Sequence, residues 1–264
     1  MIVRILSAVL VLLVASPPSI AQPPPRDLGE AVAVAVRPGW REPDGRHVAG
    51  LAIRLAPGWK TYWRAPGRSG IAPRFDWRRS RNVAAVTPVW PRPTVLDQGD
   101  ERTIGFDGDF VLPLMIQPRD PARPMRLRGT LDIGVCAEVC VPARLRVDAA
   151  LLPDGEPDGA IRAALSDRPM AVRGATCVLV HHRGGLALSV ELAAPPLGAP
   201  EVVAFEGPDL WFGDAEVDRR DGVLHAVVPI ADPSSGPVAL DRARLRITAI
   251  GSARAVETLG CLGG

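Results

Sequence analysis

The sequence predicts an all-β protein that consists of two tandem immunoglobulin-like antiparallel β-sandwich domains. The first observation is the density of helix breakers, since the chain holds 28 prolines and 26 glycines, which leave few uninterrupted stretches for helices. The second is the spacing of short apolar segments, which recur roughly every ten residues between turn formers, as in a β-sandwich. The third is the length of 264 residues, which is enough for two domains with a core each.

The expected strands are short segments that are continuously apolar or that alternate small and branched apolar residues. In the first domain they cover 31–36, 48–55, 83–90, 110–116, 125–133 and 143–151. In the second domain they cover 175–181, 186–192, 201–205, 222–230 and 238–250.

A linker is expected over 153–167, because its first half, 153–159, combines turn formers with acids and carries no large apolar residue. A short helix is expected at its end, over 160–167. The two predicted domains therefore span 27–152 and 168–264.

Residues 1–21 have the layout of a secretory signal peptide. A basic start at Arg4 is followed by an apolar run from Ile5 to Ala15 and by the small-residue triplet that ends at Ala21. The apolar run is short for a membrane span, and no later stretch reaches the roughly 20 apolar residues that a spanning helix needs. We expect an exported protein without stable membrane insertion; a retained anchor is the alternative.

Charge and motifs exclude several classes of function. The formal net charge is +2, and the arginine-rich stretch 74–81 is expected to be a solvated loop face, so nothing favours a nucleic-acid partner. The histidines His181, His182 and His225 lack a spaced partner set and are expected to be surface or hydrogen-bonded residues. No metal or cofactor is expected, and no hydrolase triad or phosphate loop is present.

Cys136 and Cys140 are the strongest functional signal. They lie four residues apart between Gly134 and Pro142, which favours a turn between two strands, because the cysteines of a disulfide need a closer approach than a regular helix allows at this spacing. A redox-active pair, a structural disulfide and a thiolate metal site all fit the spacing. Glu138 between them would raise a thiol pKa, and no lysine or histidine is adjacent in sequence, so any activation of a thiol must come from the fold.

Cys177 and Cys261 are distant in sequence, and we expect them to form a structural disulfide that ties the C-terminal segment to the second domain. Closing a long loop gives such a bridge its stabilising effect. A second exchange-active pair or two free thiols are the alternatives.

Four blocks of the first domain resemble a known family. They are Gly58–Arg64, Pro73–Trp77, Val111–Leu114 and Gly134–Pro142, and they resemble the amino-terminal periplasmic domain of the DsbD and ScsB thiol:disulfide interchange proteins over roughly 30–152.

This resemblance implies an immunoglobulin-like domain whose cysteines, on a hairpin, relay reducing equivalents in the periplasm of a Gram-negative bacterium. Cys136 and Cys140 match the family's redox pair, with Cys140 as the attacking residue, and Tyr62 matches an aromatic residue beside the pair. Trp59 and Phe106 are expected to support the site. The family's partners are periplasmic thioredoxin-fold proteins, and two sandwich domains point to the ScsB branch.

Two departures from the family pattern matter. In DsbD the cysteines are further apart in sequence, and a phenylalanine on a cap loop shields them; here the corresponding stretch, 94–103, has no aromatic residue, which leaves Phe106 or Trp90 as a shield. The membrane and thioredoxin-like domains of the family do not follow Gly264, so a separate membrane electron donor is expected.

The resulting prediction is a thiol–disulfide exchange protein, which if active is a component of a protein-disulfide reductase. The alternatives are a non-enzymatic binding or assembly module with structural disulfides, and a copper-tolerance protein that binds Cu(I).

Overall fold

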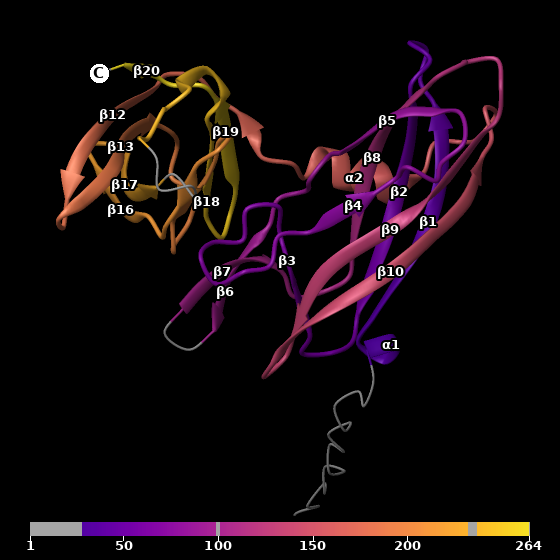
Figure 1. Cartoon of the computed structure of the whole chain (residues 1–264), viewed down its shortest axis with the longest axis horizontal. Helices are drawn as coiled ribbons and strands as arrows, with labels where there is room; N and C mark the ends of the chain where they lie inside the picture. Colours follow the sequence, from indigo (N-terminus) through magenta and orange to yellow (C-terminus); the bar gives the residue numbers. More distant parts are fainter. Residues whose placement is uncertain (1–27, 99–100, 232–236, 264) are drawn as a thin grey trace, which may run out of the picture.

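The computed structural model describes residues 28–98, 101–231 and 237–263 as two β-sandwiches (Figure 1). The predicted all-β class with two immunoglobulin-like sandwiches is confirmed. The predicted signal peptide, 1–21, lies outside the described residues. The two described α-helices have four and eight residues, and no helix in these ranges is long and apolar enough to cross a membrane.

The first sandwich has a four-stranded sheet in the order β1-β2-β8-β5 and a second sheet in the order β10-β9-β3-β7-β6, with β4 paired to β9. All of these pairings are antiparallel. The elements are α1 (Leu28–Ala31), β1 (Val32–Arg41), β2 (His47–Leu55), β3 (Lys60–Tyr62), β4 (Arg74–Asp76), β5 (Val83–Pro88), β6 (Thr94–Gln98), β7 (Glu101–Phe106), β8 (Phe110–Pro118), β9 (Met125–Cys136) and β10 (Cys140–Leu151).

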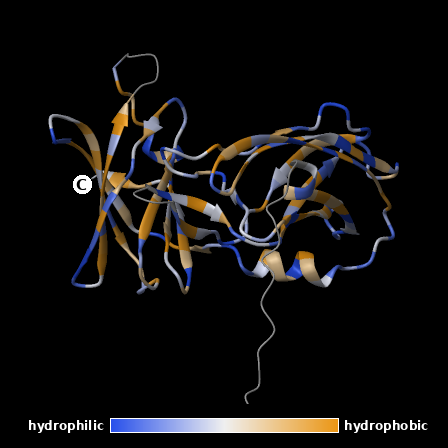
Figure 2. Cartoon of the chain, turned by 90° about the horizontal axis from the view of Figure 1, so that it is seen from below, coloured by the Kyte–Doolittle hydropathy of each residue, from blue (hydrophilic) through white to orange (hydrophobic). Residues whose placement is uncertain are grey.

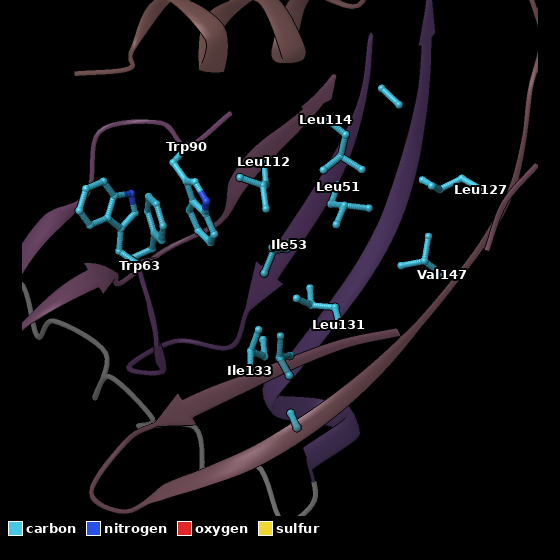
Figure 3. Packing of buried hydrophobic residues seen from close by; sticks show 14 of the residues in the cluster. Leu51, Ile53, Trp63, Trp90, Leu112, Leu114, Leu127, Leu131, Ile133 and Val147 are labelled. Carbon is cyan, nitrogen blue, oxygen red and sulfur yellow. The ribbon is translucent and has the colours of Figure 1, made fainter. Parts of the chain in front are cut away.

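The core of this sandwich forms because its strands alternate buried and more exposed residues, a pattern visible as alternating colours in Figure 2. Leu51, Leu112, Leu127 and Leu131 lie between the sheets, and the fully buried Trp63 lies at one end of the same cluster, next to Trp90 (Figure 3). Each buried leucine contributes about 1.5–3 kcal/mol through loss of water contact.

Helix α2 (Gly159–Ser166) falls within the segment expected to link the domains, and it packs on the first sandwich. Asp158 caps it by accepting hydrogen bonds from the backbone N–H groups of Ala160 and Ile161, at 2.8 and 3.1 Å. Ile161 is fully buried against Trp40. The helix is therefore anchored at its start and along its apolar face.

The second sandwich joins β11-β19-β18-β14 in one sheet and β15-β17-β13-β12-β20 in the other, with β16 paired to β17. The pairings of β11 with β19 and of β12 with β20 are parallel. The elements are β11 (Met170–Ala171), β12 (Ala175–His182), β13 (Gly185–Ala193), β14 (Val202–Glu206), β15 (Trp211–Phe212), β16 (Glu216–Arg220), β17 (Val223–Ala231), the 3-10 helix η1 (Arg242–Arg244), β18 (Arg246–Ile250), β19 (Ala255–Leu259) and β20 (Leu262–Gly263).

The strand expected over 238–250 is wrong in its first half. Only Arg246–Ile250 is extended, because Asp241 accepts a hydrogen bond from the backbone N–H of Ala243 and starts the 3-10 helix. Several short strands with charged residues were also not predicted, among them β4 and β16.

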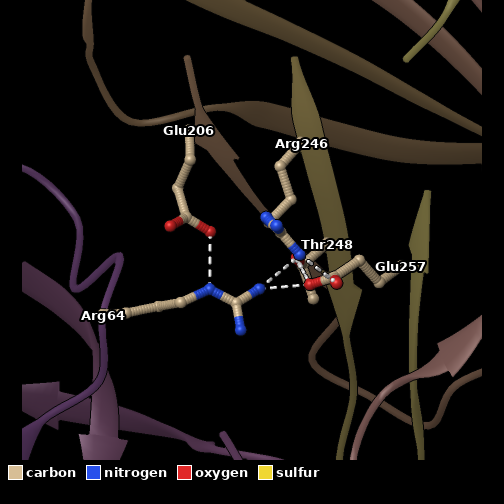
Figure 4. A network of polar contacts seen from close by, with 5 residues as sticks. All are labelled: Arg64, Glu206, Arg246, Thr248 and Glu257. Carbon is tan, nitrogen blue, oxygen red and sulfur yellow. Dashed lines mark hydrogen bonds and ion pairs between the residues drawn. The ribbon is translucent and has the colours of Figure 1, made fainter. Parts of the chain in front are cut away.

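The two sandwiches contact each other through apolar and ionic groups. Ala204 and Ile250 of the second sandwich belong to the same buried cluster as the core of the first. Beside them, Arg64 from the first sandwich forms ion pairs with Glu206, at 2.7 Å, and with Glu257 (Figure 4).

Candidate functional site

The two cysteines of the predicted site lie at the closed end of the β9–β10 hairpin. Cys136 is the last residue of β9, Cys140 is the first of β10, and the antiparallel register places them directly opposite each other. They form a disulfide, with their Cα atoms 4.0 Å apart. The position in a turn between strands, expected from the flanking Gly134 and Pro142, is thus confirmed.

The two residues of this disulfide differ in exposure. Cys136 is 1% exposed, whereas Cys140 is exposed, like the turn residues Ala137, Glu138 and Val139 that precede it. Thiol–disulfide exchange needs access to a sulfur along the line of attack. A molecule that approaches the tip of the hairpin therefore meets Cys140 first.

Tyr62 is the side chain that joins the cysteines to the body of the sheet. It ends strand β3, is 2% exposed, and its hydroxyl lies 3.1 Å from Sγ of Cys140 and 3.1 Å from Sγ of Cys136. The expectation that Tyr62 lies beside the pair came from the family resemblance, and the structure places it there. A hydroxyl at this distance can donate a hydrogen bond to a thiolate, which stabilises the charged form.

Gly134 makes room for the tyrosine ring. A Cβ atom at this position would lie 2.9 Å from Cδ2 and Cε2 of Tyr62 and 3.0 Å from Cβ of Ile71. Thr61, which faces the opposite side of β3, donates a hydrogen bond from Oγ1 to the carbonyl oxygen of Gly134 at 2.8 Å. Gly134 therefore leaves space for the tyrosine ring over β9, and the hydrogen bond of Thr61 fixes β3, the strand that carries the ring, to β9.

The other two expected supporting residues are parts of the core. Phe106 stacks on Phe110, with ring centroids 3.8 Å apart, and on Trp90 at 6.3 Å. Trp59 is half-buried against the same cluster. They support the sheet that carries the site, and the hydroxyl contact with the sulfurs comes from Tyr62.

A shallow groove of about 690 Å³ runs along the hairpin and is lined by Ile71, Ala72 and Pro142 on its apolar side. Ile71 is 43% exposed, and Val139 at the hairpin tip is 71% exposed. A larger cleft of about 810 Å³ lies between the two sandwiches, and neither cysteine lines it. Neither cysteine lines the groove either, but Pro142, two residues after Cys140, belongs to its lining.

Within residues 28–98, 101–231 and 237–263, no cluster of three or more histidine, cysteine, aspartate or glutamate residues is arranged to hold a metal ion. His182 lies 3.1 Å from a carboxylate oxygen of Glu216, and His225 lies 3.6 Å from one of Glu191. These two histidines are thus partners of carboxylates, as expected for surface or hydrogen-bonded residues.

Lys60 was not among the predicted site residues, because it is far from the cysteines along the chain. The register of β3 and β9 places Lys60 directly opposite Cys136. The one feature of the sequence that distinguishes this residue is that Lys60 is the single lysine of the chain.

The fold and the site together define an immunoglobulin-like domain that presents a disulfide at the end of a hairpin, followed by a second β-sandwich. Residues 30–151 match the family model described as thiol:disulfide interchange protein DsbD, N-terminal. This match spans the first sandwich and agrees with the resemblance seen in the sequence.

The solved structure of the N-terminal periplasmic domain of ScsB from Proteus mirabilis is similar to this chain over both sandwiches. The match has a TM-score of 0.65 and 22% sequence identity, and it covers 89% of this chain and 94% of the ScsB domain. It shows a shared fold. No curated protein sequence matches the chain significantly.

Proposed function

We propose that this protein is a periplasmic thiol–disulfide exchange protein that relays reducing equivalents to thioredoxin-fold partners through Cys136 and Cys140. The match of residues 30–151 to the DsbD N-terminal family model supports the reaction class. The observation that carries the assignment to this pair is the combination of an exposed Cys140, a buried Cys136 and a tyrosine hydroxyl 3.1 Å from each sulfur.

In the reduced protein, the Cys140 thiolate attacks one sulfur of a partner disulfide. A Cys140–partner bond forms, the partner disulfide breaks, and the second partner sulfur leaves as a thiolate. The Cys136 thiolate then attacks Cys140, closes the Cys136–Cys140 disulfide and releases the first partner sulfur. Two electrons pass to the partner, whose two thiolates take up protons from water; a membrane-bound donor is the proposed source of the electrons.

Each residue has a distinct role in this sequence. Cys140 is the nucleophile because it is accessible, and Cys136 is the resolving residue because it is buried directly opposite on the hairpin. Tyr62 donates a hydrogen bond to whichever sulfur carries the charge. A docking partner would contact two exposed apolar side chains, Ile71 in the groove and Val139 at the hairpin tip.

The decisive measurement is the reduction potential of the Cys136–Cys140 pair, obtained by equilibration with glutathione or dithiothreitol buffers and mass spectrometry of each cysteine. A potential above about −250 mV supports the relay, because exchange catalysts lie in this range, and a potential below about −300 mV contradicts it.

A second test traps the mixed disulfide between this protein and a partner. Cys136→Ala should form a mixed disulfide with a thioredoxin-fold protein that lacks its own resolving cysteine, while Cys140→Ala should not. Equal trapping by both variants would contradict the assigned roles. Cu(I) binding that disappears with either cysteine would favour the copper-tolerance alternative, and a pair that resists reduction until the protein unfolds would favour the binding module.

A further inference from the structure

Lys60 is chemically singular in this chain. Of the 31 lysines and arginines, 30 are arginines and Lys60 is the single lysine. The two residue types are not equivalent, since the lysine ammonium is a compact point charge on a flexible stem and the arginine guanidinium is a planar, delocalised fork.

The fold places this lysine in line with the cysteines. Lys60 on β3 is opposite Cys136 on β9, which is in turn opposite Cys140 on β10. Residues directly opposite each other in antiparallel strands project to the same face, with Cα atoms about 4.5–5.5 Å apart. Tyr62, two residues along β3, projects to that face as well, and its hydroxyl contacts both sulfurs.

Lys60 forms no ion pair with the described side chains. Its half-buried side chain donates a hydrogen bond from Nζ to a neutral acceptor, the backbone carbonyl oxygen of Asp97, at 3.3 Å. Many arginines, by contrast, form ion pairs at 2.5–2.9 Å, such as Arg126 with Asp148 and Arg144 with Asp132. Because β6 lies on the other side of β3 from β9, the ammonium group must turn from this carbonyl toward the cysteines to reach a thiolate.

The elements next to Lys60 also carry charged groups. Glu138 lies in the hairpin turn. Asp107 directly follows Phe106, the residue of β7 that is opposite Thr61 of β3. The carboxylate of Asp97 lies 3.5 Å from the guanidinium of Arg102. The negative charge of Glu138, in the turn between the two cysteines, disfavours a thiolate, and a nearby cation would offset this effect.

We propose that Lys60 is a positioning residue for thiol–disulfide exchange, whose ammonium group stabilises the thiolate of the reduced cysteine pair. The inference rests on the proposed function. When the disulfide accepts two electrons, two thiolates form; the cation keeps the reacting sulfur deprotonated, so that its proton stays with the solvent. Stabilising the reduced form in this way also makes the disulfide a stronger oxidant.

The first test compares Lys60→Met with Lys60→Arg and with the control Arg146→Met, which removes an exposed cation of β10 away from the cysteines. The readout is the rate of Cys140 alkylation by iodoacetamide as a function of pH in reduced protein. Lys60→Met should raise the thiol pKa and slow alkylation at pH 7 about three- to tenfold, the size of a partly screened Coulomb interaction. Lys60→Arg should restore most of the rate, and Arg146→Met should match the parent protein.

A tenfold loss of thiolate stabilisation corresponds to about 30 mV in the reduction potential, so Lys60→Met should also move the potential of the pair downward. An unchanged alkylation profile in a folded Lys60→Met variant would overturn the proposal. If the pair exchanges normally in the parent protein and only this profile is unchanged, the inference about Lys60 fails while the proposed function stands.

The second test uses the unmodified sequence and does not depend on a variant that folds. Reductive methylation with ¹³C-formaldehyde labels Lys60 as the single side-chain amine and keeps its charge. Because coupling between two sites is reciprocal, the pKa of the labelled amine should be higher in the reduced protein than in the oxidised protein. Identical titration curves in the two states would overturn the proposal, even if the cysteine pair proves to be exchange-active.

Discussion

The hydroxyl of Tyr62 lies 3.1 Å from the sulfur of Cys140, a residue 78 positions further along the chain. Tyr62 is also the single tyrosine of the protein. The same hydroxyl contacts Cys136, so it stays next to the pair whichever sulfur carries the charge. This relationship makes the tyrosine a direct participant in the proposed exchange.

Replacing Tyr62 by phenylalanine should raise the pKa of the Cys140 thiol in reduced protein. A hydrogen bond to a charged group contributes about 1.5–3 kcal/mol, so losing it should slow alkylation of Cys140 at pH 7 about tenfold or more. The control is Thr61→Val, which removes the bond to the Gly134 carbonyl and should lower stability by about 1 kcal/mol without changing the thiol pKa. The same loss of rate in both variants would show that the effect is one of packing.

Arg64 should contribute more to stability than other interdomain arginines. Its side chain is 17% exposed, it pairs with Glu206 and Glu257, and its guanidinium lies 4.0 Å from the centre of the Trp63 ring. Arg64→Met leaves two carboxylates without this partner and should lower the free energy of unfolding at pH 7 by about 2 kcal/mol or more. Arg68→Met is the control, because Arg68 and Asp214 are each 58% exposed and such pairs contribute less than about 1 kcal/mol.

The Arg64 network also predicts a dependence on pH. Burial raises the pKa of Glu257, but the charges of Arg64 and Arg246 and the hydrogen bond from Thr248 outweigh it and hold the pKa below its ordinary value. A carboxyl group of this kind contributes stability above its unfolded pKa of about 4.3, and the contribution is lost as the pH falls through the folded value. Urea unfolding from pH 7 to pH 3 should show this loss in the parent protein and a smaller loss in Arg64→Met. Parallel curves would contradict the assignment.

The second disulfide should behave as a brace. Cys177 on β12 is 1% exposed and is bonded to Cys261 across 84 residues. Replacing both cysteines by alanine should lower stability by about 2–4 kcal/mol and leave the alkylation profile of Cys140 unchanged. In the folded parent protein, dithiothreitol should reduce Cys136–Cys140 well before Cys177–Cys261; mass spectrometry after timed quenching measures the order, and the reverse order would contradict both roles.

The long strands of the fold could be predicted from the sequence, because they carry strong apolar patterns. The segments predicted at 48–55 and 125–133 are within β2 and β9, whose buried side chains include Leu51 and Leu131. The short strands β4 and β16 were missed because Arg74–Asp76 and Glu216–Arg220 are rich in charge. Each of them pairs with a long strand of a larger sheet, β4 with β9 and β16 with β17. Their extended conformation therefore depends on backbone pairing more than on an apolar pattern in their own residues.

The sequence by itself determined the composition of the candidate site and the class of the fold. Two cysteines four residues apart between a glycine and a proline, in a chain of short apolar segments, predict a disulfide between strands of a sandwich. The tertiary structure decided which cysteine is accessible and which distant residues surround the sulfurs. Lys60 and Tyr62 come to the pair through β3, some 75 residues upstream of the hairpin. Cross-strand register depends on the packing of whole sheets, and that information is not contained in the spacing of any local motif.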